Sequence, residues 1–99
     1  MEVIRTEGAS CMEGFIARAG SLTLNHDAIV FEYKDHKQFQ PVSVPLVDID
    51  KVDYFRTLSI IPNGLSVFLR SGDMIHFIVD DRKSWQDAIL KAKKAKTGV

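Results

Sequence analysis

The chain has 99 residues, of which 45% are apolar and 26% are charged, and thirteen basic residues balance thirteen acidic ones. This length and composition predict one soluble domain over residues 1–99 that buries its core without disulfides or metals. The zero formal net charge excludes a long-range field that would recruit nucleic acid or an anionic membrane, so any such attraction must be local.

Compartment signals are few. Cys11 is the only cysteine, so no intramolecular disulfide can form, and the first residues lack a charged-then-apolar leader. No apolar run approaches the roughly 20 residues that a membrane-spanning helix needs. These features predict a cytoplasmic protein, and peripheral attachment to a membrane stays open.

The N-terminal third predicts an edge strand and then a hairpin. Residues 1–12 are the least regular: Val3 and Ile4 open the edge strand, and residues 7–10 are expected to form a loop or bend. Residues 15–24 and 28–33 are strand-like and flank a tight turn at residues 25–27. Alternate apolar residues predict one buried face, made of Leu22, Leu24, Ile29, Phe31 and Tyr33.

The middle of the chain predicts two further strands. Residues 40–44 read as a short edge strand because Pro41 cannot donate a ladder hydrogen bond. Asp48 suits the cap of a short helical turn over residues 49–51, before a strand over residues 52–58. Residues 60–64, Ile-Ile-Pro-Asn-Gly, are typical of a loop, in which Ile60 and Ile61 are unusually apolar.

Residues 65–79 predict a second hairpin whose register follows from its pattern. Pairing of Leu69 with Ile75 across residues 71–73 places the apolar residues 65, 67, 69, 75, 77 and 79 on one face. The opposite face then carries Phe68, Met74 and Ile78, and is more apolar than a fully solvated face requires. This outer face is a candidate contact surface.

A C-terminal helix is predicted from Arg82 to about Lys96. Asp80 and Asp81 supply an N-cap, and an apolar stripe at helical spacing consists of Trp85, Ala88, Ile89 and Ala92. Residues 93–99 are expected to form a basic tail that frays. Cations gather at the carboxyl end of the helix, where its dipole favours them: Lys91, Lys93, Lys94 and Lys96.

Three passages resemble the pleckstrin-homology (PH) superfold, and among its branches they are most similar to GRAM-like and small bacterial PH-like domains. These are Gly20 to Leu24 followed by Ile29 to Phe31, the run Val44 to Ile49, and Trp85 in the last helix. The resemblance implies a mainly β fold, a barrel of about seven antiparallel strands capped by the helix, with Trp85 plugging its open end. It also implies attachment to phosphoinositides or proteins, although the first hairpin region offers only Arg5 and Arg18 for phosphate contact.

Catalytic, cofactor and metal motifs are not found in the sequence. Cys11 has no histidine near it in sequence, and His26, His36 and His76 show no metal-ligand spacing. No glycine-rich phosphate loop occurs, and basic and aromatic residues are not interleaved on a strand. The sequence therefore predicts a protein that is not an enzyme, with no cofactor, small-molecule substrate or nucleic-acid partner.

Two binding hypotheses remain. The first is protein–protein interaction or self-association through Phe68, Met74 and Ile78, with Ile60 and Ile61 as a second candidate surface. The alternative is weak, nonspecific attachment to anionic phospholipid through the lysines of the C-terminal helix, each worth on the order of 1 kcal/mol near such a surface. The sequence does not identify the partner, the lipid headgroup or the oligomeric state.

Overall fold

The computed structural model describes residues 3–35, 37–57 and 61–97. Its elements follow the order β1 (Val3–Glu13), β2 (Ile16–Asn25), β3 (Ala28–Tyr33), β4 (Val42–Pro45), the 3₁₀ turn η1 (Leu46–Asp48), β5 (Ile49–Thr57), β6 (Ile61–Leu69), β7 (Met74–Ile78) and α1 (Arg82–Thr97). Seven antiparallel strands and one C-terminal helix confirm the predicted fold class. The helix continues through most of the stretch expected to fray.

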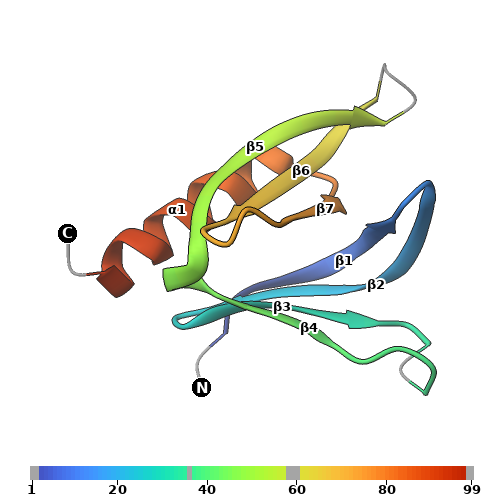
Figure 1. Ribbon diagram of the computed structural model, residues 1–99, viewed down its shortest axis with the longest axis horizontal. Helices are drawn as coiled ribbons and strands as arrows, with labels where there is room; N and C mark the ends of the chain where they lie inside the picture. The colour runs from blue at the N-terminus through green and yellow to red at the C-terminus, as the bar shows by residue number, and fades with distance from the viewer. Residues whose placement is uncertain (1–2, 36, 58–60, 98–99) are drawn as a thin grey trace.

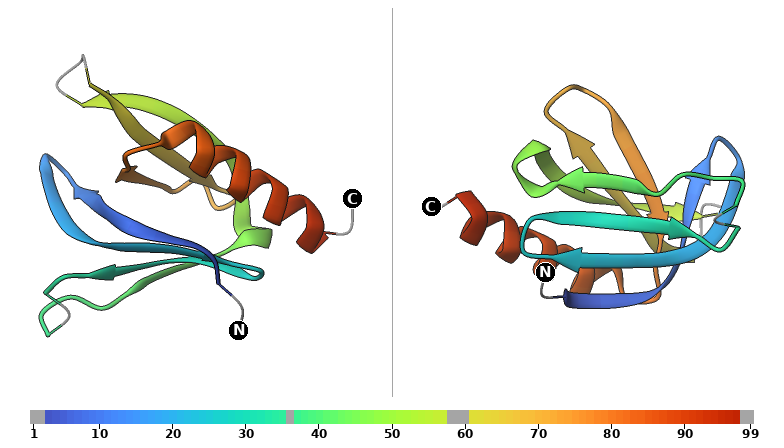
Figure 2. Two further views of the ribbon diagram at one scale, coloured as in Figure 1. Left: turned by 180° about the vertical axis from the view of Figure 1, so that it is seen from behind. Right: turned by 90° about the horizontal axis from the view of Figure 1, so that it is seen from below.

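The strands form one sheet in the order β4-β3-β2-β1-β7-β6-β5, folded into two layers. Strands β1 to β4 make one layer and β5 to β7 the other, and α1 lies across one end beside β5 and β6 (Figures 1 and 2). Among the described residues β4 and β5 are the outer strands of the order, so the sheet does not close into the predicted barrel. The architecture is an open sandwich with one end covered by the helix.

The core lies between the two layers and under α1. Trp85 is fully buried, which confirms its place as the plug of this end. Strand residues of both layers surround it or lie deeper in the sandwich, including Leu22, Leu24, Ile29, Phe31, Leu65, Val67 and Phe77. No helix among the described residues is long and apolar enough to cross a membrane.

Strand β1 corrects the prediction for the N-terminus. It runs unbroken through residues 7–10, which were expected to bend, and it lies in the centre of the sheet between β2 and β7 instead of at an edge. The reason is visible in its inward side chains: Arg5 stacks on the indole of Trp85, and Glu7 accepts a hydrogen bond from Trp85 Nε1 at 3.1 Å. Polar residues on the inner face hide the apolar alternation by which a strand is recognised.

The turns of the middle region agree in part. Asn25 Oδ1 accepts hydrogen bonds from the backbone N–H groups of Asp27 and Ala28, which fixes the predicted turn between β2 and β3. The helical turn, however, begins three residues earlier than predicted and has no side-chain cap, so Asp48 ends the turn instead of capping it. The buried Leu46 anchors this turn, and its N–H donates to the carbonyl of Asp27.

The second hairpin keeps the predicted faces but not the predicted pairing. Val67 pairs with Ile75 and Phe68 with Met74, so the ladder is displaced by two residues from the predicted pairing of Leu69 with Ile75. The Leu69 N–H donates to the Asp73 carbonyl, and Gly72, at a φ of 97°, makes the turn. Because side chains alternate with a period of two, a two-residue displacement returns the same residues to the core.

The predicted loop at residues 60–64 is wrong where it can be compared. Strand β6 already begins at Ile61 and pairs with Thr57 of β5, so residues 61–64 belong to the ladder. Ile60 and the predicted end of the preceding strand at Leu58 lie outside the described residues, as does His36. Gly64 is required here because Phe55 of the paired strand lies too close for a side chain: an added Cβ would sit 2.3 Å from the Phe55 carbonyl oxygen and 2.5 Å from Phe55 Cδ1.

Candidate functional site

A two-stranded finger, residues 12–18, projects from the end of the sandwich opposite α1 (Figure 1). It consists of the last residues of β1 and the first of β2. Pairing of β1 with β7 is limited to Ser10 and Cys11, and pairing of β2 with β3 begins only at Gly20, so the finger residues pair only between β1 and β2. This end of the sandwich therefore carries a protrusion that its neighbouring strands do not cover.

The tip of the finger is apolar. Glu13 pairs with Ile16, leaving a two-residue turn of Gly14 and Phe15, and Gly14 has a φ of 62°, which glycine adopts without strain. The Phe15 side chain has a relative exposure of 104%, and Ile16 one of 55%. Turns of this kind usually carry polar residues, and a completely exposed phenylalanine adds nothing to the packing of the core.

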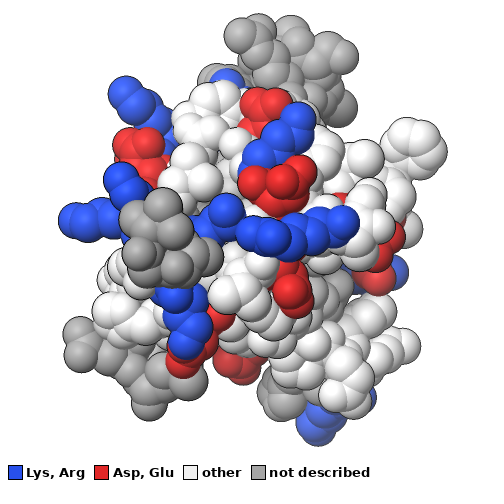
Figure 3. Space-filling view, turned by 60° about the vertical axis from the view of Figure 1, so that its left-hand side comes forward, with Lys and Arg blue, Asp and Glu red and all other residues white. Residues whose placement is uncertain are grey.

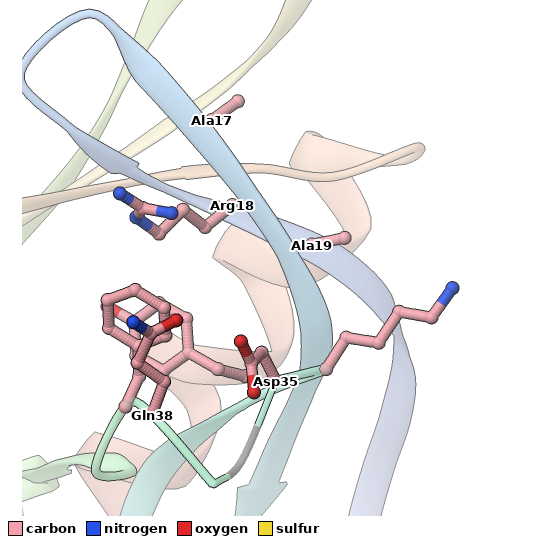
Figure 4. A pocket seen from close by; sticks show the side chains of 8 residues that line it. Ala17, Arg18, Ala19, Asp35 and Gln38 are labelled. Carbon is pink, nitrogen blue, oxygen red and sulfur yellow. The ribbon is translucent and has the colours of Figure 1, made fainter.

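A pocket of about 500 Å³ lies behind the finger, between β2 and the segment after β3. Its wall combines polar and aromatic side chains with two exposed alanines: Ala17, Arg18, Ala19, Tyr33, Lys34, Asp35, Gln38 and Phe39. Figure 4 shows Arg18 pointing to the opposite side of β2 from Ala17 and Ala19, towards the part of the loop that bears Gln38. The pocket thus offers cations beside aromatic surface.

Arg18 is the most constrained cation of the pocket. Its guanidinium lies 4.5 Å from the ring centroid of Phe39 and forms an ion pair with Glu13 of the finger. Phe39 in turn packs on Tyr33, with ring centroids 5.1 Å apart. Glu13 pairs with Arg18, and the rest of the lining adds one lysine, Lys34, and one carboxylate, Asp35, so the pocket does not present a cluster of several unpaired cations.

Cys11 and Tyr33 are buried neighbours beneath this pocket. Burial raises the pKa of the Cys11 thiol, and burial together with the adjacent Cys11 raises the pKa of Tyr33 to about 12. Both groups are therefore neutral at physiological pH. A neutral, buried thiol is a poor nucleophile, so the geometry agrees with a structural role for Cys11.

The outer face of the β5–β7 layer carries the predicted contact residues. Met74 is 53% exposed, whereas Phe68 and Ile78 are half-buried, and Lys51 Nζ lies 4.8 Å from the ring centroid of Phe68. Phe55 and His76 stack edge-on beside Ile78. The structure brings the three predicted residues onto one face, and their role as a contact surface stays a prediction.

The lysines at the end of α1 differ in their exposure and their contacts. Lys96 forms an ion pair with Asp27 of the turn between β2 and β3, and Lys93 is half-buried, while Lys91 is exposed. Contact of these residues and Lys94 with an anionic surface stays a prediction.

The finger was not predicted from the sequence, because Phe15 was assigned to a strand. Gly14, next to the polar Glu13, was the available signal of a tight turn.

No group of three or more histidine, cysteine, aspartate or glutamate side chains that could hold a metal occurs in the part of the chain that the structure describes.

No family model matches the sequence, and no curated protein matches it. Solved structures do. The Vps36 N-terminal PH domain has a TM-score of 0.78 at 15% identity, with 99% of this chain and 83% of that chain covered.

Two further PH domains give the same result. The N-terminal PH domain of human ARAP2 has a TM-score of 0.74 at 13% identity, covering 94% of this chain and 81% of that one. The Slm1-PH domain in complex with phosphoserine has a TM-score of 0.73 at 18% identity, covering 93% and 96%. The fold is that of a PH domain. At these identities the likeness concerns the fold alone, and assignment to the GRAM-like branch stays a prediction.

Proposed function

We propose that this PH-like domain is a non-catalytic module that attaches peripherally to phospholipid membranes with its finger. The fully exposed Phe15 carries the proposal. Together with Ile16 it forms a convex apolar tip, and a convex tip suits insertion into a soft interface, where aromatic rings are favoured. Arg18 and Lys34 line the pocket behind the tip, where they could contact lipid phosphates.

The solved neighbours support a phosphate in this role. The Slm1-PH domain was crystallised with phosphoserine and with inositol-4-phosphate, both of which carry a phosphate monoester. In this chain Glu13 and Asp35 offset Arg18 and Lys34, so we expect little preference for a particular anionic headgroup. The apolar tip then supplies most of the affinity.

The expected affinity is low. Burial of a phenylalanine and an isoleucine is worth roughly 1.5–3 kcal/mol each. Before the costs of association are subtracted, their sum corresponds to a dissociation constant in the millimolar range or somewhat below it. Attachment through the finger alone is therefore reversible, and stable localisation requires a second contact or several copies.

Vesicle sedimentation tests the proposal. The wild type should sediment with phosphatidylcholine vesicles, bind only slightly better when phosphatidylserine is added, and remain bound at high salt. A Phe15→Ser, Ile16→Ser double variant should lose binding, whereas Met74→Ser, which removes an exposed apolar side chain elsewhere, should not. Equal binding of the double variant and the wild type would overturn the proposal, and binding that disappears at high salt would favour the lysines of α1.

Protein association through the outer face is the second candidate function. The observation in its favour is the exposed Met74 beside Phe68 and Ile78 on one sheet face. A symmetric dimer through this face would appear as a doubled mass in light scattering, abolished by Phe68→Lys with Ile78→Lys and unaffected by Phe15→Ser. A monomeric wild type with no binding partner for this face would remove this candidate.

A further inference from the structure

A second concave surface, which the finger does not need, lies along the C-terminal half of α1. It is a trough of about 390 Å³ lined by Ile4, His26, Ala88, Lys91, Ala92 and Ala95. Ala88, Ala92 and Ala95 share one side of the helix, at spacings of four and three residues. Trp85 and Ile89 fill the contact with the sandwich in the first half of α1, but the alanines further along present only methyl groups.

The trough is apolar and open to solvent. Ile4 of β1 forms its opposite wall and is 42% exposed, and Ala95 is exposed as well. Closing the space would need only a larger side chain at one of the alanine positions. Ala92 is almost fully buried and Ala88 is half-buried against the core, so an occupant of the trough would contact mainly Ala95, Ile4 and Lys91.

Lysines gather on the last turns of α1, which form one side of the trough. Four lysines and no acidic residue occur between Lys91 and Lys96, against the carboxylates of Asp27 and Asp87 nearby in structure or sequence. Figure 3 shows this end of the molecule, with blue side chains projecting on several sides and red ones between them. One of these lysines, Lys96, is held by Asp27 at the end of the trough, whereas Lys91 is part of its lining.

We infer that this trough binds an acidic amphipathic helix of a partner protein. Apolar side chains on one face of such a helix would enter the space above the alanines, and its flanking carboxylates would meet Lys91 and its neighbours. A second copy of this chain fits poorly, because its own α1 would bring a second set of lysines to the interface. A bilayer also fits poorly, since the apolar surface is concave and a flat membrane would touch its edges first.

The position of the trough gives this partner a distinct role. The trough is lined by residues of α1, the start of β1 and the turn after β2. The finger projects from the end of the sandwich opposite α1 (Figure 1). The domain can therefore hold a helix of one protein at one end while its finger is engaged at the other. This inference does not depend on what the finger binds.

A peptide-binding experiment tests the inference with the full chain. The probe is a fluorescently labelled synthetic helix with leucines at i, i+3, i+4 and i+7 and glutamates on both flanks. Its binding is followed by fluorescence anisotropy and mapped by NMR chemical shifts. Binding should shift the amides of Ala88, Ala95, Ile4 and His26 and leave those of the finger unchanged. A peptide with lysines in place of the glutamates should bind at least tenfold more weakly.

Variants of the chain complete the test. Ala95→Trp, which fills the trough from an exposed position, and Lys91→Glu should each weaken the acidic peptide at least tenfold. Lys83→Glu, the matched charge reversal at the start of α1, should leave binding within twofold. Should Ala95→Trp fail to fold, Lys91→Glu and the charge-reversed peptide still decide. No binding of the acidic peptide, equal binding of both peptides, or shifts confined to the finger would each overturn the inference.

Discussion

The two ends of the sandwich use the same three kinds of side chain with different consequences. At the end covered by the helix, Arg5 lies over the indole of Trp85 and pairs with Glu7. At the open end, Arg18 lies over the ring of Phe39 and pairs with Glu13. The first set contacts a fully buried tryptophan, whereas the second borders an open pocket.

The difference shows how burial assigns a role to a given chemistry. Glu7 is needed where it is, because it accepts the hydrogen bond of a buried indole N–H that would otherwise lose its partner. The ion pair of Glu13 with Arg18 is exposed, and exposed pairs contribute about 0–1 kcal/mol to stability. The covered end therefore holds the fold together, and the open end is free to change its contacts.

The largest effect is expected from removal of the plug. Trp85→Ala takes away a fully buried side chain at the junction of α1 with both layers, and the cavity and lost burial should cost about 3–5 kcal/mol. Chemical denaturation followed by circular dichroism measures this. A midpoint equal to that of the wild type would show that α1 does not dock as described, and the comparison of the two ends would fail.

The matched pair of glutamates tests the comparison directly. Glu7→Ala should lower the free energy of unfolding by about 1–3 kcal/mol, because the indole N–H of Trp85 loses its acceptor and Arg5 loses its partner. Glu13→Ala should change the same quantity by less than about 0.5 kcal/mol. Both values come from one series of urea titrations. Equal losses would mean that the open end contributes to stability as much as the covered end.

These contrasts also explain what the sequence could reveal. Strict alternation of apolar residues in β3 and β6 predicted which side chains face the core, and a ladder shifted by two residues left that result intact. Asp81 was recognised as a cap because its position before Arg82 is diagnostic, and its carboxylate does accept the Ser84 N–H at 3.1 Å.

Other features depend on partners that are distant in the sequence. Arg5 and Glu7 contact the core only because Trp85 lies opposite them, almost eighty positions later. The finger is exposed because β7 and β3 stop pairing with β1 and β2 before it begins. The sequence of residues 12–18 does not reveal where that pairing ends. The trough exists because α1 extends past Ile89, the last large side chain of its apolar stripe. Predicting the trough would require knowing how far β1 reaches along the helix.

Alkaline pH should reveal the raised pKa of Tyr33, which lies at the open end, as a loss of stability. Its pKa is raised from 10 to about 12, so the folded chain holds the phenolic proton more tightly than the unfolded chain does. The corresponding stabilisation is complete below pH 10 and is lost as the pH rises towards 12. As the pH rises from 10 towards 12, the denaturation midpoint of the wild type should therefore fall relative to that of Tyr33→Phe, which has no phenolic proton to lose. A difference between them that stays constant with pH would contradict the raised pKa.

The smallest effect on stability, and the sharpest test of the open end, belongs to Phe15. Because its ring is completely exposed and touches no core residue, Phe15→Ser should change the free energy of unfolding by less than about 0.5 kcal/mol. Gly14→Ala, at the neighbouring position with positive φ, should cost about 1 kcal/mol through backbone strain alone. Serine at position 15 that destabilises the chain more than alanine at position 14 would show that the ring packs against the protein in solution. If the serine variant instead keeps full stability and loses vesicle binding, the phenylalanine serves binding and not folding, as the contrast with the fully buried Trp85 implies.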